Sequence, residues 1–156
     1  MKLPFTIQKK YTSNFSADNI LEFIKNLDEQ KSNYLGFDFK DYEVKSSNSN
    51  FDFQRRKKKS ETTMHPTVNG TISPDKSIEI KVQPNMTGFI IFALIAFVTV
   101  NFIYTGIGNL IKTGSFTSLI LPVLLSAFAF FYYKRVTNPI ASTVEWLEES
   151  LELSEL

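Results

Sequence analysis

A single histidine and the absence of cysteine limit the chemistry available to this chain of 156 residues. His65 could act as a general base or a pH switch, because imidazole titrates near neutral pH. The chain offers it no second histidine and no thiolate, and Pro66 follows it at the start of an expected strand. We therefore expect His65 to be structural or solvent-exposed.

Four carboxylates fall on neighbouring strands of an expected hairpin: Asp38, Asp41, Glu43 and Asp52. Paired carboxylates can carry out acid–base catalysis or bind a hard cation. Here they have no glycine-rich loop and no metal-ligand spacing around them, and such positions usually form the solvent-facing side of a strand. We expect no catalytic residue, no metal site and no cofactor, and we predict that the protein is not an enzyme.

Five consecutive cations form the most pronounced polar feature of the sequence: Arg55, Arg56, Lys57, Lys58 and Lys59. One interpretation is an edge strand protected by charge from pairing with another sheet. Another is contact with anionic lipid headgroups or with the acidic tail of the chain itself. Phosphates of a nucleic acid could also bind such a run. No aromatic residue is interleaved with it, however, so we expect no nucleic-acid partner.

The same chain contains two uncharged apolar stretches, 82–111 and 113–133, which are separated by Lys112. Any fold that positions the polar residues must also accommodate these two stretches. As a helix, segment 88–107 would be about 30 Å long, which matches the hydrocarbon thickness of a bilayer. Segment 116–133 is near the shorter end of what can span a membrane. We predict a transmembrane helical hairpin over 86–134, with the lipid bilayer as its first partner.

Few polar side chains lie within the predicted spans. Thr99 and Asn101 in the first span and Ser126 in the second are expected to form helix–helix contacts, since interhelical hydrogen bonds in membranes contribute about 0.6 kcal/mol on average. No charged residue lies at the middle of either span. Proton-relay and ion-pump functions therefore lack the residue type they normally need.

The positions of the lysines and arginines around the spans predict the topology. Lys76 and Lys81 precede the first span, Lys134 and Arg135 follow the second, and the connecting loop carries only Lys112. Because cytoplasmic loops are richer in lysine and arginine, we predict a multi-pass protein of the cytoplasmic (inner) membrane with both termini in the cytoplasm.

Residues 1–85 carry the periodicities of a small cytoplasmic α+β domain. Ser16 is a candidate N-cap for a helix over 17–29, on which Ile20, Ile24 and Leu27 share one face. Alternating apolar residues predict the strands. The expected fold class is a small antiparallel sheet in the order βαββββ with one covering helix, its strands being 3–11, 34–45, 51–58, 64–72 and 77–83, with the last turn at 73–76.

The tail, 135–156, is expected to form an acidic amphipathic helix of its own. Asn138-Pro139 predicts a break after the second span, and Ser142 with Glu145 resembles a capping box that starts a new helix. One face of that helix is apolar and should dock on the soluble domain or on a partner: Ile140, Val144, Leu147 and Leu151. Its negative charge could be held by the basic run at 55–59.

The segment 66–72, with Pro66, Gly70 and Ile72, is followed by an alternating strand at 78–82 and then directly by the apolar stretches. This arrangement resembles a group of uncharacterised small bacterial membrane proteins that have an N-terminal α+β domain and a two-helix transmembrane hairpin. The charged residues at 55–59 and Glu61 depart from the pattern of that group. The resemblance implies an architecture and no activity.

These observations favour an integral membrane protein that acts as a non-enzymatic, membrane-tethered interaction or sensing module. We expect it to form a homo-oligomer or a complex with a membrane protein partner. One hairpin cannot enclose a solute path, so any transport would require several copies. The alternative is a membrane effector or pore-forming protein whose hairpins oligomerise.

Overall fold

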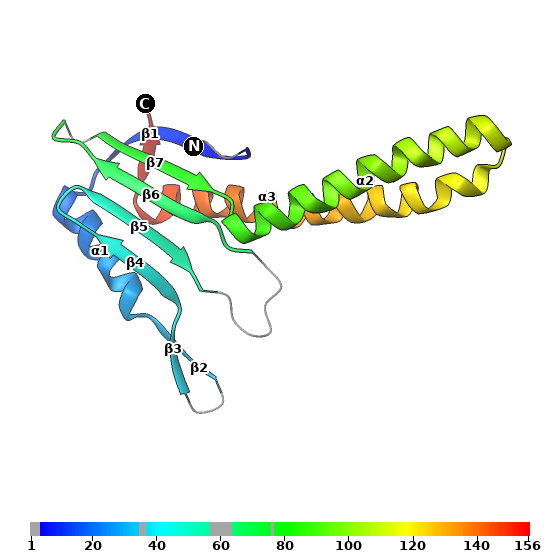
Figure 1. Cartoon of the computed structure of the whole chain (residues 1–156). Coiled ribbons are helices and arrows are strands. Elements are labelled where there is room, and N and C mark those ends of the chain that lie inside the picture. The colour runs from blue at the N-terminus through cyan, green and yellow to red at the C-terminus, as the bar shows by residue number, and fades with distance from the viewer. Residues whose placement is uncertain (1–3, 35–36, 57–63, 76) are drawn as a thin grey trace.

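The computed structural model describes residues 4–34, 37–56, 64–75 and 77–156 of the chain. It is an α+β protein from which two long helices project side by side (Figure 1). The elements are β1 (Ile7–Ser13), α1 (Ala17–Glu29), β2 (Lys31–Tyr34), β3 (Phe37–Lys40), β4 (Tyr42–Ser46), β5 (Asn50–Arg55), β6 (Thr67–Ile72), β7 (Ser77–Gln83), α2 (Met86–Thr113), the 3-10 turn η1 (Phe116–Leu119), α3 (Ile120–Ser150) and β8 (Leu153–Glu155).

Six strands form an antiparallel sheet in the order β4-β5-β6-β7-β1-β8, and β2 and β3 form a separate two-stranded ribbon. The predicted hairpin between β6 and β7 is confirmed, with Ile72 opposite Ile78 and the Ser73 amide donating to the Ser77 carbonyl at 2.8 Å. Alternate residues of β7, including Ile80 and Val82, are buried. One face of the sheet is therefore apolar, and other elements must pack on it to shield it from water.

The first helix covers part of that face. α1 has the predicted bounds, and the hydroxyl of its N-cap Ser16 accepts a hydrogen bond from the Asn19 amide at 3.2 Å. Ile20, Ile24 and Leu27 are buried on one side of the helix. They belong to a single hydrophobic core with the sheet and with the last turns of α3. Burial of these apolar faces against each other is what holds the two helices to the sheet.

The predicted helix break at Asn138-Pro139 is wrong, because α3 continues through Pro139 to Ser150. Proline inside a helix removes one hydrogen bond and costs about 3 kcal/mol. Val136 and Ile140, on either side of it, are buried in the structure. Burying such side chains contributes about 1.5–3 kcal/mol each, so packing of an unbroken helix outweighs the proline cost.

The predicted strand pattern is only partly correct. The single strand expected over 34–45 is divided between β3 and β4, and β2 begins before it. The end of the tail, expected to be helical, forms β8 and pairs with β1 through Tyr11–Glu155, Thr12–Ser154 and Ser13–Leu153. These differences arise from pairing partners that are far apart in the sequence, and local periodicity does not reveal such partners.

α2 and the first turns of α3 form two apolar helices, which we call the helix pair. Asn85 caps α2 by accepting hydrogen bonds from the Thr87 and Gly88 amides at 2.9 and 3.3 Å. Gly114 ends it in the left-handed conformation (φ +67°), which glycine adopts without strain. Both helices are long and apolar enough to cross a membrane. Only 11% of the most apolar 18-residue stretch of each helix is buried in the protein.

Candidate functional site

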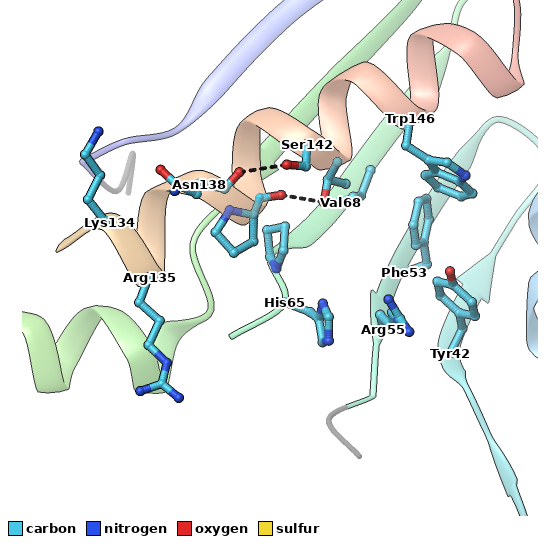
Figure 2. A pocket seen from close by; sticks show the side chains of 13 residues that line it. Tyr42, Phe53, Arg55, His65, Val68, Lys134, Arg135, Asn138, Ser142 and Trp146 are labelled. Carbon is cyan, nitrogen blue, oxygen red and sulfur yellow. Dashed lines mark hydrogen bonds between the residues drawn. The ribbon is translucent and has the colours of Figure 1, made fainter. Parts of the chain in front are cut away.

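A cavity of about 560 Å³ lies between the sheet and α3, next to the base of the helix pair (Figure 2). Phe53 on β5 and Trp146 on α3 form part of its apolar lining, with ring centroids 6.2 Å apart in an edge-to-face arrangement. Tyr42 on β4 stands edge-on to Phe53 at 6.3 Å. Such a partly aromatic cavity falls within the size range of small-molecule sites.

Positively charged side chains from two elements line the same cavity. Arg55 comes from the end of β5, whereas Lys134 and Arg135 come from α3 at the point where its apolar stretch ends. His65 also lines the cavity and lies between Arg135 and Arg55 in the view of Figure 2. Its backbone is fixed by the Gln54 side-chain amide, which donates to the His65 carbonyl at 3.0 Å. Among the described residues that line the cavity there is no carboxylate.

The basic run is thus divided by the structure. Arg55 lines the cavity, whereas Arg56 lies in the adjoining groove, where its guanidinium is 4.0 Å from the Glu43 carboxylate. Lys57, Lys58 and Lys59 lie outside the described residues. Two of the predicted lipid- or tail-contacting residues can therefore be placed, and one of them faces a cavity.

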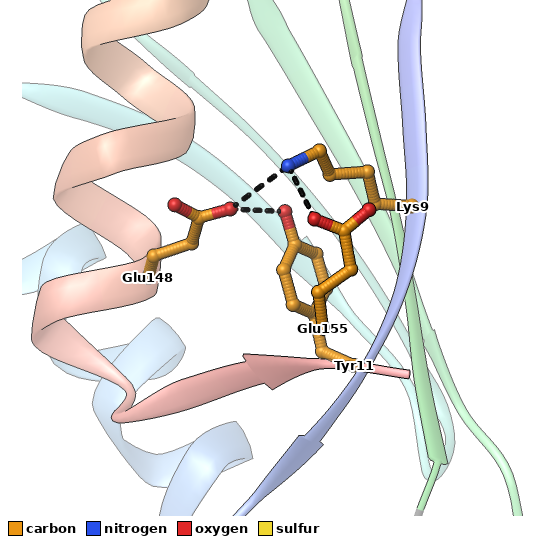
Figure 3. Close-up of polar contacts among 4 residues, drawn as sticks. All are labelled: Lys9, Tyr11, Glu148 and Glu155. Carbon is orange, nitrogen blue, oxygen red and sulfur yellow. Dashed lines mark hydrogen bonds and ion pairs between the residues drawn. The ribbon is translucent and has the colours of Figure 1, made fainter.

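The four residues of the predicted tail-docking face, Ile140, Val144, Leu147 and Leu151, are all buried in the hydrophobic core that the sheet forms with its helices. The acidic side of the tail is held by β1 (Figure 3). Lys9 Nζ lies 2.8 Å from Glu155 and 3.4 Å from Glu148, and the Tyr11 hydroxyl donates to Glu148 at 2.7 Å. Of the described cations, it is Lys9 rather than Arg55 or Arg56 that forms ion pairs with the tail.

This polar network changes how its members titrate. Burial, together with the hydrogen bond to Glu148, raises the pKa of the Tyr11 hydroxyl well above its ordinary value. The hydrogen bond to Glu155 raises the pKa of Lys9. Both shifts favour the protonated forms of these groups, which are the forms that donate hydrogen bonds in this network.

The polar residues of the predicted spans bond within their own helices. Thr99 Oγ1 donates to Ile95, Asn101 Nδ2 to Phe97 and Ser126 Oγ to Pro122, each at 2.8 Å. Thr99 is buried, whereas Asn101 lies on the exposed side of α2.

The interhelical bond comes from a residue that the sequence did not indicate. Ser118 Oγ donates to the Gly106 carbonyl at 3.1 Å. The absence of a side chain at Gly106 allows this approach, because a Cβ there would lie 2.8 Å from the Ser118 carbonyl oxygen.

The four candidate carboxylates do not gather in one site, although Glu43 lies near enough to Asp52 to contribute to its raised pKa. Ser32 Oγ donates to Asp41, Asn33 Nδ2 donates to Asp38 at 3.0 Å, and burial raises the pKa of Asp52. Within the described parts of the chain, no three histidine, aspartate or glutamate side chains are grouped so that they could hold a metal ion.

Sequence reasoning missed Lys9, Trp146 and Tyr42 as members of these two sites. The one available signal is that Trp146 is the single tryptophan of the chain, next in sequence to Leu147 of the predicted apolar face of the amphipathic tail helix. No family model, no curated protein and no solved structure matches the chain. The site must therefore be interpreted from its own chemistry.

Proposed function

We propose that this is an integral protein of the cytoplasmic membrane, with both termini in the cytoplasm, that acts as a membrane-tethered interaction or sensing module. The observation that carries the proposal is the continuity of α3. One unbroken helix runs from the apolar helix pair into the core of the soluble domain. The domain and the helix pair therefore move together, and a change at one end is transmitted to the other.

Apolar exposure supports membrane insertion. Side chains such as Phe97, Phe131 and Leu94 are more than half exposed along the helix pair. Exposed apolar surfaces of this extent mark a membrane or a protein interface, whereas a helix in the core of a soluble protein would be buried. The hydrocarbon core of a bilayer is thick enough to surround the apolar length of both helices in the helix pair.

Association with a second copy or another membrane protein follows from Asn101. Its amide is exposed on α2 three residues before Tyr104, which is 82% exposed, so both lie on one side of the helix. Amide groups in membrane helices favour hydrogen bonds to another helix over contact with lipid. We propose this side of α2 as the contact between chains.

Photo-crosslinking in native membranes tests this association. A photoreactive phenylalanine analogue at Tyr104 should give an adduct of discrete mass, and Asn101→Leu should reduce its yield. The same analogue at Val123, which is 65% exposed on α3, serves as a control for random collision. Equal adduct yields at positions 104 and 123 would contradict the proposed contact. A yield at position 104 that does not change with Asn101→Leu would contradict it as well.

The pore-forming alternative predicts a different result. Reconstituted protein that formed pores would release dye from liposomes and migrate as a large oligomer. We expect an intact dye gradient, because the helix pair carries no charged residue between Met86 and Ile111 or between Phe116 and Tyr133. Dye release at low protein-to-lipid ratio would favour the pore.

A further inference from the structure

We propose that the turn at Pro4 and Phe5 is a third membrane-contacting element, whose aromatic ring lies among lipid molecules at the cytoplasmic interface of the bilayer. This inference rests on the proposed membrane insertion of the helix pair. It goes beyond that insertion, because it assigns a lipid-contacting surface to residues that precede β1. Figure 1 shows β1 beginning beside the base of the helix pair, and ring contacts made by Phe5 agree with this view.

Three aromatic rings fix the level of this turn along the helix pair. The Phe5 ring meets the Phe92 ring edge-on at a centroid distance of 5.8 Å and the Tyr133 ring at 5.4 Å. The rings of Phe92 and Tyr133 also contact each other, with centroids 6.0 Å apart. Phe5 therefore joins a cluster to which α2 and α3 each contribute one ring.

The two partner rings lie within the apolar stretches that are predicted to span the membrane. Phe92 follows the start of the span 88–107 by about one helical turn. Tyr133 is the last residue of the span 116–133, and Lys134 follows it directly. Tyrosine next to lysine is the residue pattern of the membrane–water interface. When the helix pair crosses a bilayer, a ring that contacts both Phe92 and Tyr133 is placed at this interface.

The composition of the segment suits contact with lipid. Residues 4–7 are proline, phenylalanine, threonine and isoleucine, so none of their side chains is charged. Pro4 has no backbone N–H, and the turn therefore has one donor fewer to leave without a partner in an apolar environment. The side chain of Phe5 is 37% exposed. Because the rest of the ring packs on the helix pair, its exposed part continues the apolar surface that faces lipid.

The backbone of Phe5 is held in a conformation that phenylalanine rarely adopts. Its φ is +65°, in the left-handed region, where a bulky side chain is disfavoured. Residues in such conformations persist where the surrounding structure fixes them, and they are concentrated at sites of ligand contact and switching. The ring contacts with Phe92 and Tyr133 fix Phe5 here. The turn is thus shaped to present this ring to the helix pair and to the lipid around it.

β1 links the turn to the docked end of α3. Further along β1, Lys9 Nζ lies 3.4 Å from the Glu148 carboxylate, and the Tyr11 hydroxyl donates to the same carboxylate at 2.7 Å. A lipid-dependent change at Phe5 can therefore reach α3 through a single strand. The contact gives the proposed sensing module a defined place at which its sheet meets the membrane.

Tryptophan fluorescence in lipid bilayers tests the contact. Trp146→Phe removes the one native tryptophan, and Phe5→Trp, Phe15→Trp or Phe97→Trp then introduces a single new one into the full-length protein. Each variant is reconstituted in phosphatidylcholine vesicles. Phe15 is the matched control, because it is 38% exposed and lies beyond the other end of β1. Phe97, which is 68% exposed within the span 88–107, reports insertion of the helix pair.

Phosphatidylcholine that carries bromine on the upper or middle part of its acyl chains quenches a tryptophan that it contacts. We expect these lipids to quench Phe5→Trp and to leave Phe15→Trp as bright as in unbrominated vesicles. The emission maximum of Phe5→Trp should also lie at shorter wavelength than that of Phe15→Trp. The native side chains at the two positions are covered by protein to nearly the same extent, so the difference distinguishes lipid from water.

Equal quenching at positions 5 and 15 would overturn the proposal. Position 97 separates this inference from the proposed function. Quenching at position 97 without quenching at position 5 would mean that the helix pair is inserted while the turn lies in water. The absence of quenching at position 97 would contradict both the insertion and the lipid contact.

A second measurement leaves Phe5 in place. The chain has no native cysteine, so Pro4→Cys carries a single spin label beside the ring, and Ser47→Cys in the β4–β5 turn serves as its control. Relaxation of the label at position 4 should respond more to oxygen, which partitions into lipid, than to a water-soluble nickel complex. The label at position 47 should show the reverse. The same response at both positions would overturn the proposal, and the melting temperature of each variant checks that the fold is kept.

Discussion

At the scale of single residues, the contact between Tyr11 and Glu148 is the most informative polar interaction between the sheet and α3. Tyr11 is buried on β1, and its hydroxyl donates to a carboxylate on the last turn of α3 at 2.7 Å. The bond joins the first strand to the last helix. We therefore expect it to contribute to the stability of the whole domain rather than to a local segment.

Tyr11→Phe should lower the free energy of unfolding by about 1–2 kcal/mol, because it removes a hydrogen bond to a charged acceptor and leaves that acceptor partly buried. Thermal unfolding followed by circular dichroism in detergent measures the change. Thr12→Val is the control, since the Thr12 side chain on the same strand contacts only the Ser154 carbonyl at 3.5 Å. Equal stability of Tyr11→Phe and the unchanged protein would contradict this assignment.

The same bond predicts a pH dependence. The pKa of Tyr11 is raised in the folded protein above the ordinary value of 10.0. In the unfolded chain the hydroxyl loses its proton first, so its stabilising contribution is complete below pH 10 and declines as the pH rises towards the folded-state pKa. The melting temperature should fall more steeply above pH 10 in the unchanged protein than in Tyr11→Phe. Parallel curves would show that another group is responsible.

Gly70 provides a residue-scale test of packing. It lies opposite Phe51 in the pairing of β5 with β6, and a Cβ at Gly70 would come within 1.9 Å of the buried Phe51 ring. Gly70→Ala should destabilise the protein by about 1–3 kcal/mol, because overpacking displaces the ring. Chemical denaturation measures the loss. A midpoint equal to that of the unchanged protein would mean that the ring moves aside at little cost.

At the scale of elements, close packing in the helix pair depends on Gly106. A Cβ there would meet the Ser118 carbonyl at 2.8 Å and Pro122 at 2.9 Å, whereas a Cβ at Gly108 would have nothing within 4 Å. Gly→Ala gains about 1 kcal/mol of helix propensity at either position. Gly106→Ala should therefore be less stable than Gly108→Ala, and the difference in melting temperature isolates the clash. A reversed order would contradict the observed packing of α2 on α3.

The docked end of α3 gives a second test at this scale. Leu147 is 1% exposed in the core, and Leu156 is 71% exposed after β8. Leu147→Ala should cost about 2–5 kcal/mol through the cavity it creates, and Leu156→Ala should cost little. Limited proteolysis would then cut the Leu147→Ala variant near the end of α3. Equal resistance of the two variants would mean that the tail is not docked on the sheet.

An element can be predicted from the sequence when the residues that specify it are close to one another in the chain. Residues 17–29 specify α1 through one cap and one apolar face, and 64–83 specify the β6–β7 hairpin, so both could be predicted. β8 depends on pairing between Ser13 and Leu153, and α3 passes Pro139 because its neighbours are buried. Packing between distant segments overrides local signals in both cases.

The candidate site was predicted less well for the same reason. Arg55 belongs to the basic run that the sequence shows. The residues next to it in the sequence do not reveal that Lys134 and Trp146 line the same cavity. Their proximity exists only once α3 is docked on the sheet. Likewise, Lys9 could not be assigned to the acidic tail, because the two come together only when β1 pairs with β8 and the end of α3 docks beside it.

At the scale of the whole molecule, α3 joins the two parts of the protein. Its first turns run beside α2 in the helix pair (Figure 1). Its middle turns line the cavity, and its last turns enter the core. A ligand in the cavity would therefore contact a helix that runs from the apolar helix pair into the core beside the sheet. This arrangement suits a module that responds to the membrane surface.

The account depends most on the two helices crossing the bilayer, and single-cysteine labelling tests this directly. The chain has no native cysteine, so Lys112→Cys at the far end of α2 and Ser47→Cys in the β4–β5 turn each give one reactive site without background. In intact cells, an impermeant maleimide should label position 112 and should reach position 47 only after the membrane is permeabilised. Equal labelling of the two positions from one side of the membrane would show that the helix pair does not span it.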